Sequence, residues 1–508
     1  MAHTHAADQK KDNVVDVIES RSDGGEKGSS IPSIDLKLDS KGLPLVPQPS
    51  AFKDDPLNWP SWLKWTVLIQ VGYMAFLGPY NAGLINPSLV LLSKAMHRDS
   101  KTAAYSTTTA IILGGVSPFI FTPLMHHYGR RPITLLAILM TILGGIGSAS
   151  SKDFSALLGT RALCGAGFGG MMSVGTASVN DMFFLHERGE KTGVYAIFVT
   201  NGAHVAALIG GFLGHAAGWQ WDYWLGAIST SLSFVVALFL FPETLFSRSP
   251  AFLNSKTHER SYFQMLWDFR GNMIPGHRLR ASDFLDSFLM LKYPSVAFSF
   301  WYYTWAWTFI NVLPAISIAT IYTKAYGLSS GPIGACLGVS LIIGSVLGEF
   351  FAGRASDYVV YMFATRNNGV RKPEYRLYLC PLSAIFMPAG LIIFGCTVGR
   401  TSSYVPPLVG LAVGVFGLQI ASTTLYAYVS DCYKPQTAES GVLFNLSRGL
   451  SFVVGFFALP LANRVGYDGA WGIFAGIVFA FFLPVASLLV WGERWRKSLG
   501  EPRFNRDR

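Results

Sequence analysis

Long apolar runs separated by short polar loops occupy most of the chain between residues 65 and 491. A helix needs about 20 apolar residues to cross the ~30 Å hydrocarbon core of a bilayer. Twelve runs approach or exceed that length, and each predicts a transmembrane helix. The longest polar insertion, at about 243–293, divides them six and six. The runs lie at 65–90, 105–125, 133–150, 154–178, 192–214, 222–242, 294–321, 332–353, 377–398, 405–429, 438–462 and 470–491.

The basic residues of the loops set the predicted orientation, because Lys and Arg are enriched in cytoplasmic loops. Loops on one side carry Arg130, Arg131, the basic middle segment and a basic stretch at 366–376, whereas 94–101 is the main basic loop on the other side. Both termini are therefore predicted to be cytoplasmic. The predicted divisions are a disordered cytoplasmic tail at 1–60, an N-terminal six-helix half at 61–243, a cytoplasmic middle loop at 244–292, a C-terminal six-helix half at 293–492 and a cytoplasmic tail at 493–508.

The composition supports a membrane protein. Of the 508 residues, 51% are hydrophobic and only 14% are charged, whereas about 25% are charged in a typical soluble domain. The net charge is +10, but the basic residues flank apolar runs and form no single patch, so the predicted partner is the lipid bilayer and not nucleic acid. Neither the five cysteines nor other residues show the spacing of a metal site, a phosphate loop or a nucleophile–base pair. We therefore expect no metal, no cofactor and no enzyme activity.

The two sets of six runs show weak internal symmetry. The loop after the second run reads PLMHHYGRR, and the loop after the eighth reads AGRASDY followed by a basic stretch. Both loops occupy the same place in a six-helix half. Repeats of this kind build transporters whose substrate site lies between two halves near the middle of the membrane. The sequence thus predicts an all-α membrane protein with twelve transmembrane helices in two pseudo-symmetric halves.

The first of these loops resembles the loop 2–3 signature of the major facilitator superfamily. Tyr128, Gly129, Arg130 and Arg131 match its aromatic–Gly–Arg–Arg end, and His126 stands where the family has an acid. The resemblance implies the superfamily's fold, a protein that acts as a monomer without a cofactor, and a role for the loop in latching the two halves. Because His126 replaces the acid, a pH-responsive latch is a hypothesis. The gating candidates are His126, Gly129, Arg130, Arg131 and, from the second half, Arg354 and Asp357.

Other stretches resemble the fungal branch of twelve-span drug:proton antiporters. DDPLNWP at 54–60, RALCGAGFGG from Arg161, HERGEKTGVY and PETLF resemble motifs of that branch, and GEFFAGRASD with RNNGVRKPEYRL resembles a subgroup of organic-cation and polyamine carriers. The resemblance, over about 54–495, implies proton-coupled export of small organic molecules by alternating access at a fungal plasma membrane. Ala206 and Ala207 replace the antiporter Gly-Pro of helix 5. Proton-coupled uptake of an organic cation, polyamine or other nutrient is therefore the alternative, and a nutrient-sensing receptor is less favoured.

Four ionisable residues lie well inside the apolar runs, where a central charge costs about 2.5–3.5 kcal/mol on the insertion scale and needs a watery cavity or a partner. Glu349 is the first candidate proton carrier because it is an acid within a span. His204 is the second because an unperturbed imidazole titrates near neutral pH. The alternatives are a latch between Glu349 and Arg354, and a hydrogen-bonded core role for His204. Arg161 and Arg448 stay charged, so we expect them to bind or pair and not to carry protons.

Polar side chains at helical spacing mark faces that are costly in lipid, and they predict a wet central cavity. Trp301 and Trp305 share a face and lie too deep in the seventh run for an interfacial belt, so they are candidates to stack a flat or cationic substrate. Hydrogen bonding between helices and core packing are the respective alternatives. The predicted cavity residues are Gln70, Tyr73, Asn81, His204, Trp301, Trp305, Gln419, Tyr426 and Asn445.

The hinge between the second and third runs has a predicted mechanical role. Gly129 permits a tight turn. Arg130 and Arg131 are expected at the cytoplasmic surface, where they would hold lipid phosphates, carboxylates or helix C-termini of the opposite half. The hinge is thus predicted to close the cytoplasmic side.

Overall fold

The computed structural model of the chain describes residues 37, 45, 47–248, 250–256, 258–267, 279–367, 372–400, 403–433, 436–500 and 502. Its contacts divide the chain into two compact units, Met1–Gln48 and Pro49–Arg508, and the second contains the site. Its described residues form helices and turns but no strand. Apart from residues 37 and 45, the part of the predicted disordered tail before residue 47 lies outside the described residues, as does Arg371 of the basic stretch at 366–376.

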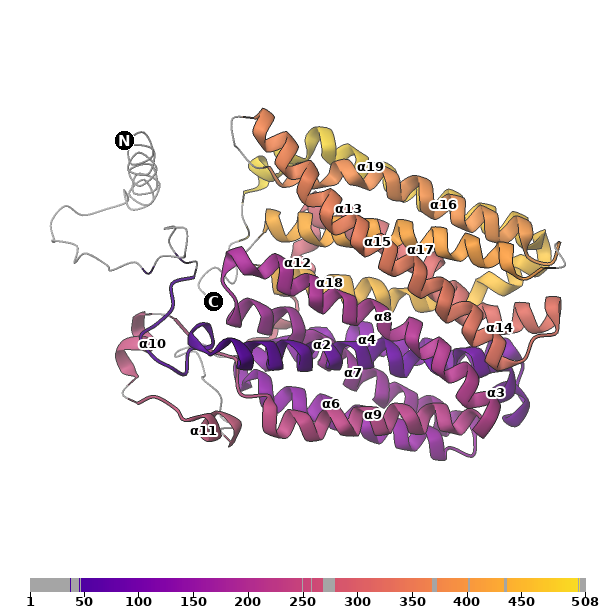
Figure 1. Ribbon diagram of the computed structural model, residues 1–508, viewed down its shortest axis with the longest axis horizontal. Coiled ribbons are helices and arrows are strands. Elements are labelled where there is room, and N and C mark those ends of the chain that lie inside the picture. The colour runs from indigo at the N-terminus through magenta and orange to yellow at the C-terminus, as the bar shows by residue number, and fades with distance from the viewer. Residues whose placement is uncertain are drawn as a thin grey trace. The chain divides into compact units, whose positions relative to one another are not determined.

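The first six spans come from the part of the chain coloured indigo to magenta (Figure 1). A short turn, η2 (Asn86–Ser88), and the seven-residue α3 (Leu89–Ala95) separate the first span from the second. The second span is bent, because α4 and α5 meet at an angle of 41°. The helices are α2 (Ser61–Gly83), α4 (Ser100–Val116), α5 (Pro118–Tyr128), α6 (Arg130–Ser150), α7 (Phe154–Met182), α8 (Leu185–Ala217) and α9 (Trp219–Leu240).

The second six spans come from the orange and yellow part of the chain. The seventh span is interrupted by a π-helical turn, η5 (Thr308–Val312). The elements are α13 (Pro294–Trp307), α14 (Leu313–Tyr326), α15 (Ser330–Arg366), η6 (Pro373–Leu379), α16 (Cys380–Thr397), α17 (Val405–Cys432), α18 (Thr437–Leu450), η8 (Ser451–Val453) and α19 (Val454–Leu499).

The number of spans agrees with the twelve predicted. Within the described residues, nine helical stretches are long and apolar enough to cross a membrane, and the bent α4–α5 pair makes a tenth. One of the nine, Glu439–Leu499, has 61 residues, which at about 1.5 Å each is far longer than a bilayer. Gly466, with φ 79° and ψ 164°, breaks this stretch into two spans. The 23-residue α2, about 35 Å long, is long enough to cross a bilayer but less apolar than these stretches, and counting it gives the twelve spans predicted.

Several predicted helix boundaries are wrong in detail. The first run was predicted to continue to residue 90, but α2 ends at Gly83 and the chain turns through η2, where Pro87 has no N–H to continue the ladder. The second run was predicted as one helix, but it bends between Ser117 and Pro118. The seventh run contains the π turn just before Pro314. Apolar runs define spans, whereas prolines and π turns decide where those spans bend.

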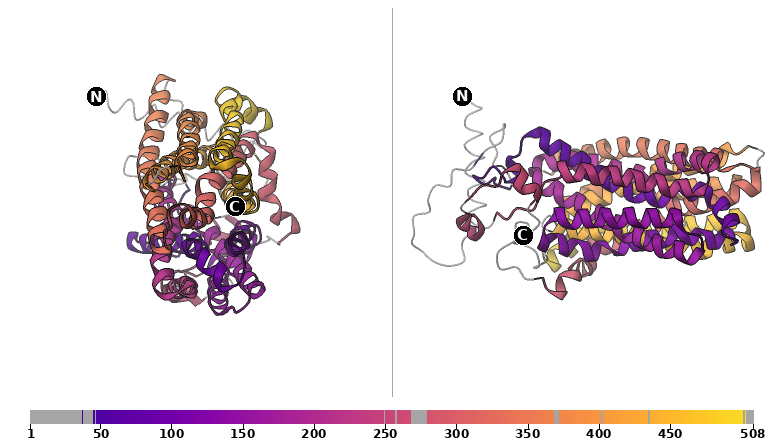
Figure 2. Two further views of the ribbon diagram at one scale, coloured as in Figure 1. Left: turned by 90° about the vertical axis from the view of Figure 1, so that its right-hand side faces the viewer. Right: turned by 90° about the horizontal axis from the view of Figure 1, so that it is seen from below.

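The two halves pack in the same way internally and meet along two helix pairs. In the first half α6 packs on α7 and α9, and in the second α16 packs on α17 and α19. Seen along the helix axes, the two sets form adjacent groups (Figure 2). Between them α8 packs against α15, and α4 against α18. Glycines allow these contacts, because a Cβ on Gly334 would lie 2.7 Å from Gly211 Cα.

Residues 49–60 belong to the second compact unit, Pro49–Arg508, although the sequence analysis assigned them to a disordered tail. The buried Asp55 accepts a hydrogen bond from Leu57 N at the start of η1 (Pro56–Asn58) and pairs with Arg248 at 2.7 Å. Asp54 pairs with Lys256 and Arg260. These pairs attach the segment to the middle loop, whose helices are α10 (Pro250–Ser255), α11 (Tyr262–Trp267) and α12 (Asp286–Leu289), with 3-10 turns η3 (Ala281–Phe284) and η4 (Met290–Lys292).

Candidate functional site

A cavity of about 80 Å³ lies between the two halves. The first half contributes residues of α2, η2, α4, α7 and α8, and the second contributes residues of α13, η5, α14 and α18. The lining residues are Pro79, Ala82, Gly83, Asn86, Thr107, Ile111, Gly114, Gly115, Phe168, Met172, Ala203, Trp307, Asn311, Val312, Ala315, Asn445, Arg448 and Gly449. The cavity is where the sequence predicted a substrate site, at the contact between two six-helix halves.

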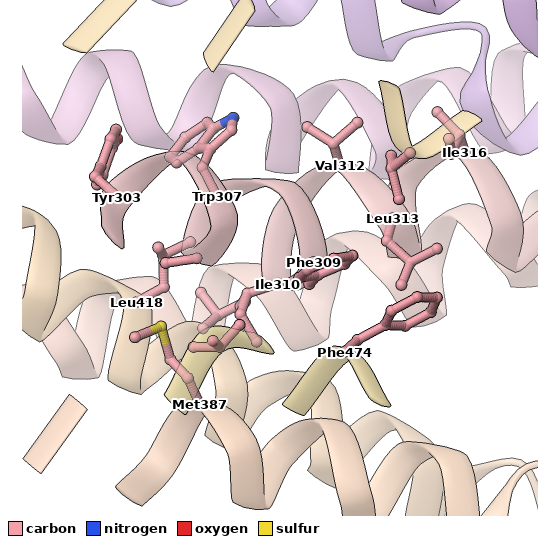
Figure 3. Packing of buried hydrophobic residues seen from close by; sticks show 14 of the residues in the cluster. Tyr303, Trp307, Phe309, Ile310, Val312, Leu313, Ile316, Met387, Leu418 and Phe474 are labelled. Carbon is pink, nitrogen blue, oxygen red and sulfur yellow. The ribbon is translucent and has the colours of Figure 1, made fainter. Parts of the chain in front are cut away.

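Arg448 is the charged residue of this lining. Its Nε donates to the Tyr303 hydroxyl at 3.1 Å, and its guanidinium carbon lies 4.7 Å from the centroid of the Trp307 ring. Tyr303 and Trp307 point toward the violet helices of the first half, away from Met387 and Leu418, which pack inside the second half (Figure 3). No carboxylate among the described residues forms an ion pair with Arg448. The aromatic side chains of α13 therefore hold a guanidinium at the boundary between the halves.

An aromatic cluster supports Arg448 from its own half. The rings of Tyr426 and Phe444 are stacked 3.9 Å apart, and the Tyr303 ring meets the Phe444 ring edge-on at 5.3 Å. The sequence predicted that Tyr426, Asn445 and Arg448 face the cavity. Asn445 and Arg448 line it, whereas Tyr426 lies behind them in this cluster.

The π turn places Asn311 in the cavity wall. Asn311 is only 3% exposed, and its Nδ2 has no hydrogen-bond partner within the described residues. A π turn shifts the register of the side chains that follow it and is frequent at functional sites. Sequence reasoning missed Asn311 and Trp307, although Asn311 is the only amide side chain of the seventh run. That lone amide was the available signal.

The predicted polar face of α2 does not reach the cavity. Gln70 Nε2 donates to Ser233 of α9, at 3.1 Å to both its carbonyl and its hydroxyl, and Asn81 Nδ2 donates to the Thr230 hydroxyl at 3.1 Å. Tyr73 stacks on Phe76, with ring centroids 6.0 Å apart. The polar face joins α2 to α9 inside the first half, so the alternative of helix-to-helix hydrogen bonding describes it better.

Arg161 and His204 are both buried, with different surroundings. Arg161 donates to the carbonyl oxygens of Asn81 and Ser106, each at 3.1 Å, and so ties α7 to α2 and α4. His204 is 0% exposed, and neither ring nitrogen has a hydrogen-bond partner in the described part of the chain. It is not a lining residue, although its neighbour Ala203 is. An unpaired buried imidazole is unusual and requires an explanation.

Glu349 lies inside the second half and not in the cavity. Its Oε2 accepts hydrogen bonds from Gln419 and, at 2.9 Å, from the Thr423 hydroxyl, so it joins α15 to α17. Gln419, predicted to line the cavity, is bound here instead. The considered latch between Glu349 and Arg354 is not formed, because the Arg354 guanidinium stacks over the Phe350 ring at 4.0 Å.

Asp222 is a buried acid that the sequence reasoning missed. It lies in the first turn of α9 and is 0% exposed, and among the described residues its side-chain hydrogen-bond partner is the Ser88 hydroxyl. A Cβ placed on Gly214 would lie 2.9 Å from Asp222 Oδ2 and 1.9 Å from the Ser88 hydroxyl. The Asp222 carboxylate and the Ser88 hydroxyl therefore both lie close to the Gly214 backbone. Asp222 stands at the first position of the run predicted at 222–242, so it was not among the ionisable residues considered well inside the runs. Glu349 is therefore not the only acid within the spans.

The tryptophan prediction requires correction. Trp301 is 44% exposed and does not line the cavity. Trp305 is stacked on Phe309 at 5.5 Å and tilted against Phe481 at 5.6 Å, in the second half. The α13 residue that does reach the cavity is Trp307, two positions further along.

The hinge arginines bind within their own half, whereas contacts to the opposite half were expected. The Arg131 side chain donates to the carbonyls of Ala237, Leu238 and Phe241 at the end of α9, because the last carbonyls of a helix have no partner within it. Glu243 accepts from the backbone N–H groups of Arg130 and Arg131, each at 3.0 Å. Both arginines are buried, at 4% and 1% exposed.

The other predicted hinge residues, Gly129 and His126, lie at the junction of α5 and α6. Gly129 adopts φ 101°, which confirms the tight turn. His126 is half-buried in the last turn of α5. Arg130 pairs with Asp181 at the end of α7, at 2.7 Å.

The second half repeats this arrangement with other residues. Arg376, just before α16, pairs with Asp431 near the end of α17 at 2.6 Å, as Arg130 at the start of α6 pairs with Asp181. Asp357, a predicted gating residue, also contacts Arg376, at 3.3 Å, and is mostly exposed. Each half thus has an Arg–Asp ion pair between the start of one helix and the end of the next, at equivalent positions.

The fold and the comparisons agree on the class of protein. A family model described as the Major Facilitator Superfamily matches residues 71–456, so the chain belongs to this family of transporters. Membership confirms the predicted fold and the prediction that the chain is not an enzyme. Among solved structures, the xylose transporter XylE from E. coli in a partially occluded, inward-open conformation matches with a TM-score of 0.61, at 14% identity, over 84% of this chain and 98% of that one.

Relatives by sequence include fungal transporters. The chain is 26% identical over 447 residues to the MFS transporter cpaT of Aspergillus oryzae, covering 85% of this chain and 87% of the relative. It is also 26% identical over 462 residues to the efflux pump radE of Floropilus chiversii, covering 89% and 84%. The chain is therefore a secondary transporter of this superfamily and a multi-pass membrane protein.

Proposed function

We propose that the chain is a proton-coupled antiporter that exports small organic molecules by alternating access. The observation that carries the proposal is the cavity between the halves, which residues of both halves line and whose lining includes Arg448. We further propose that it acts as a monomer in the plasma membrane, with both termini and the middle loop in the cytoplasm.

The small volume of the cavity supports the interpretation that the structure represents a closed state of the transport cycle. Pockets for drug-sized ligands measure about 300–1,000 Å³, whereas this cavity holds about 80 Å³. A substrate of that size therefore requires the halves to move apart. The contacts to be released are α8 with α15 and α4 with α18, where glycines bring the backbones together.

Coupling to protons requires a group that can change its charge inside the membrane. Asp222, Glu349 and His204 are candidates, because ionisable groups in spans are costly and usually functional. Among the described residues His204 has no hydrogen-bond partner and Asp222 has only the Ser88 hydroxyl, whereas Glu349 is held by Gln419 and Thr423. We rank Asp222 first, since a carboxyl that is buried without an ion-pair partner among the described residues is most stable when it carries a proton.

Export is favoured over uptake. The relative from Floropilus chiversii is named an efflux pump, and the resemblance to antiporter motifs agrees with that direction. The alternative, uptake of an organic cation or polyamine, rests on GEFFAGRASD and on Ala206 and Ala207 in place of Gly-Pro. A cavity whose only charged lining residue is Arg448 fits a cation poorly.

A deletion strain tests the direction. Cells lacking the gene are loaded with a panel of labelled organic acids, amides and amines, and intracellular accumulation is compared with that of the parent strain. Export predicts higher accumulation of at least one compound in the deletion strain, restored by the wild-type chain and by a variant at the exposed Arg464, Arg464→Gln. Lower accumulation in the deletion strain would establish uptake instead.

A further inference from the structure

The charges and polar groups of the cavity lining identify the class of substrate. Arg448 is the only charged side chain of the lining, and the lining contains no Asp or Glu. A guanidinium stays protonated under all physiological conditions. Any ligand that enters the cavity therefore meets a fixed positive charge.

That charge lacks a negative partner in the described protein. The interactions of Arg448 are a hydrogen bond to the Tyr303 hydroxyl and contacts with the faces of Tyr303 and Trp307. These neutral groups orient the guanidinium but do not neutralise it. A buried charge is tolerated when a counter-charge or strong hydrogen bonds compensate it, so an anionic ligand would complete the pairing.

A second, independent observation is the unpaired donor on Asn311. Its Nδ2 is buried in the cavity wall without a partner among the described residues. On the opposite wall, the Asn86 side-chain oxygen accepts a hydrogen bond from the Thr107 hydroxyl at 2.9 Å, which leaves the amide N–H groups as the donors of Asn86. The polar lining thus offers hydrogen-bond donors, which suit the oxygens of an acid.

The apolar part of the lining fits a flat ring. Trp307 from the second half and Phe168 from the first both line the cavity. Aromatic side chains stack on flat ligands in offset or edge-on geometry. A carboxylate attached to an aromatic ring can therefore contact both the hydrogen-bond donors and the aromatic side chains of the lining.

We infer that the cavity binds planar organic carboxylates, with Arg448 and Asn311 holding the carboxylate and Trp307 and Phe168 the ring. This inference rests on the proposed function, since it names the substrate of the same site. Arginine holds a carboxylate through two parallel N–H donors, an arrangement that lysine cannot reproduce. Lysine keeps the attraction of the charge, so Arg448→Lys should retain part of the binding that Arg448→Gln loses.

The test uses three probes that differ in charge but share one ring system: 1-naphthylacetate, its neutral amide 1-naphthylacetamide, and the cation 1-naphthylmethylamine. Binding to the purified full chain is measured by calorimetry, and carriage is measured by counterflow in proteoliposomes without a pH gradient. We expect the carboxylate to bind at least about tenfold more tightly than the amide or the amine. We expect Arg448→Gln to remove this preference, Arg448→Lys to keep part of it, and Arg464→Gln to leave it unchanged.

The outcomes separate this inference from the proposed function. Tighter binding of the amine or the amide, no binding of the carboxylate, or an unchanged preference in a folded Arg448→Gln protein would overturn the anion site. Counterflow of the amine or the amide alone would do so while leaving the transporter proposal intact. Folding of each variant is checked by its melting temperature, and Asn311→Leu provides a second variant that should weaken carboxylate binding without changing a charge.

Discussion

Gly115 of α4 and Gly449 of α18 touch across the boundary between the halves. A Cβ on Gly115 would lie 2.3 Å from Gly449 Cα, and a Cβ on Gly449 would lie 2.6 Å from Gly115 Cα. Both residues line the cavity. This close backbone contact of α4 and α18 is therefore part of the wall that must move when a substrate enters.

Gly115→Ala is expected to reduce transport, because the added methyl group meets backbone atoms that cannot rotate away. Overpacking of this kind costs about 1–3 kcal/mol, enough to shift the balance of closed and open states about tenfold. The measurement is the initial counterflow rate in proteoliposomes, normalised to the amount of reconstituted protein.

Gly472→Ala is the matched control, since a Cβ at Gly472 of α19 meets nothing within 4 Å. It should transport like the wild type. Equal rates for Gly115→Ala and the wild type would show that this contact does not limit the cycle.

Asp222→Asn is expected to uncouple transport from the pH gradient. The amide keeps the shape of the protonated carboxyl but cannot release a proton, so counterflow should persist while gradient-driven transport falls to the level seen without a gradient. The measurement compares both activities for Asp222→Asn and Glu349→Gln. If Asp222→Asn keeps the gradient response and Glu349→Gln loses it, the proton is carried in the second half.

Arg131→Gln is expected to destabilise the first half. It removes the guanidinium that binds three carbonyls at the end of α9 and the Leu266 carbonyl at 2.7 Å, at a cost of about 3 kcal/mol. The melting temperature in detergent should fall by several degrees. Arg400→Gln, which removes an exposed pair with Asp468, should cost less than about 1 kcal/mol. Equal melting temperatures for the two variants would contradict the buried role of Arg131.

The pair formed by Asp55 and Arg248 predicts a pH dependence of stability. Burial alone would raise the pKa of Asp55, but hydrogen bonds and the charge of Arg248 outweigh it and hold that pKa below its ordinary value of 3.8. A carboxylate with a lowered pKa stabilises the fold above pH 3.8, and its contribution disappears as the pH falls through the folded-state pKa. The difference in melting temperature between the wild type and Asp55→Asn should therefore be constant near neutral pH and shrink below pH 3.8. A difference that grows on acidification would contradict the pairing.

The fold was predictable because a transmembrane helix is specified by a local feature of the sequence, a run of about twenty apolar residues. The sequence could not locate the π turn at Thr308–Val312 or the bend at Ser117, because these depend on how neighbouring helices pack. Gly129 was predictable because its turn requires a positive φ that other residues rarely adopt.

The site was only partly predictable. Arg448 and Asn445 were found because a charge and an amide inside a span demand a polar environment. The same argument failed for Gln70 and Asn81, since helical spacing identifies a polar face but not the neighbour that it meets, here α9. Asp222 was missed because it is the first residue of its predicted apolar run, whereas the argument considered only charges well inside a run.

The most direct test of the account measures solute movement in proteoliposomes under an imposed pH gradient, with the probe that the chain carries fastest by counterflow and with protein-free liposomes as the blank. Proton-coupled antiport predicts that the probe accumulates above its outside concentration when the interior is acidic, and that a proton ionophore abolishes the accumulation. Accumulation driven by an acidic exterior would establish uptake by symport. Movement that ignores the gradient in either direction would contradict proton coupling altogether.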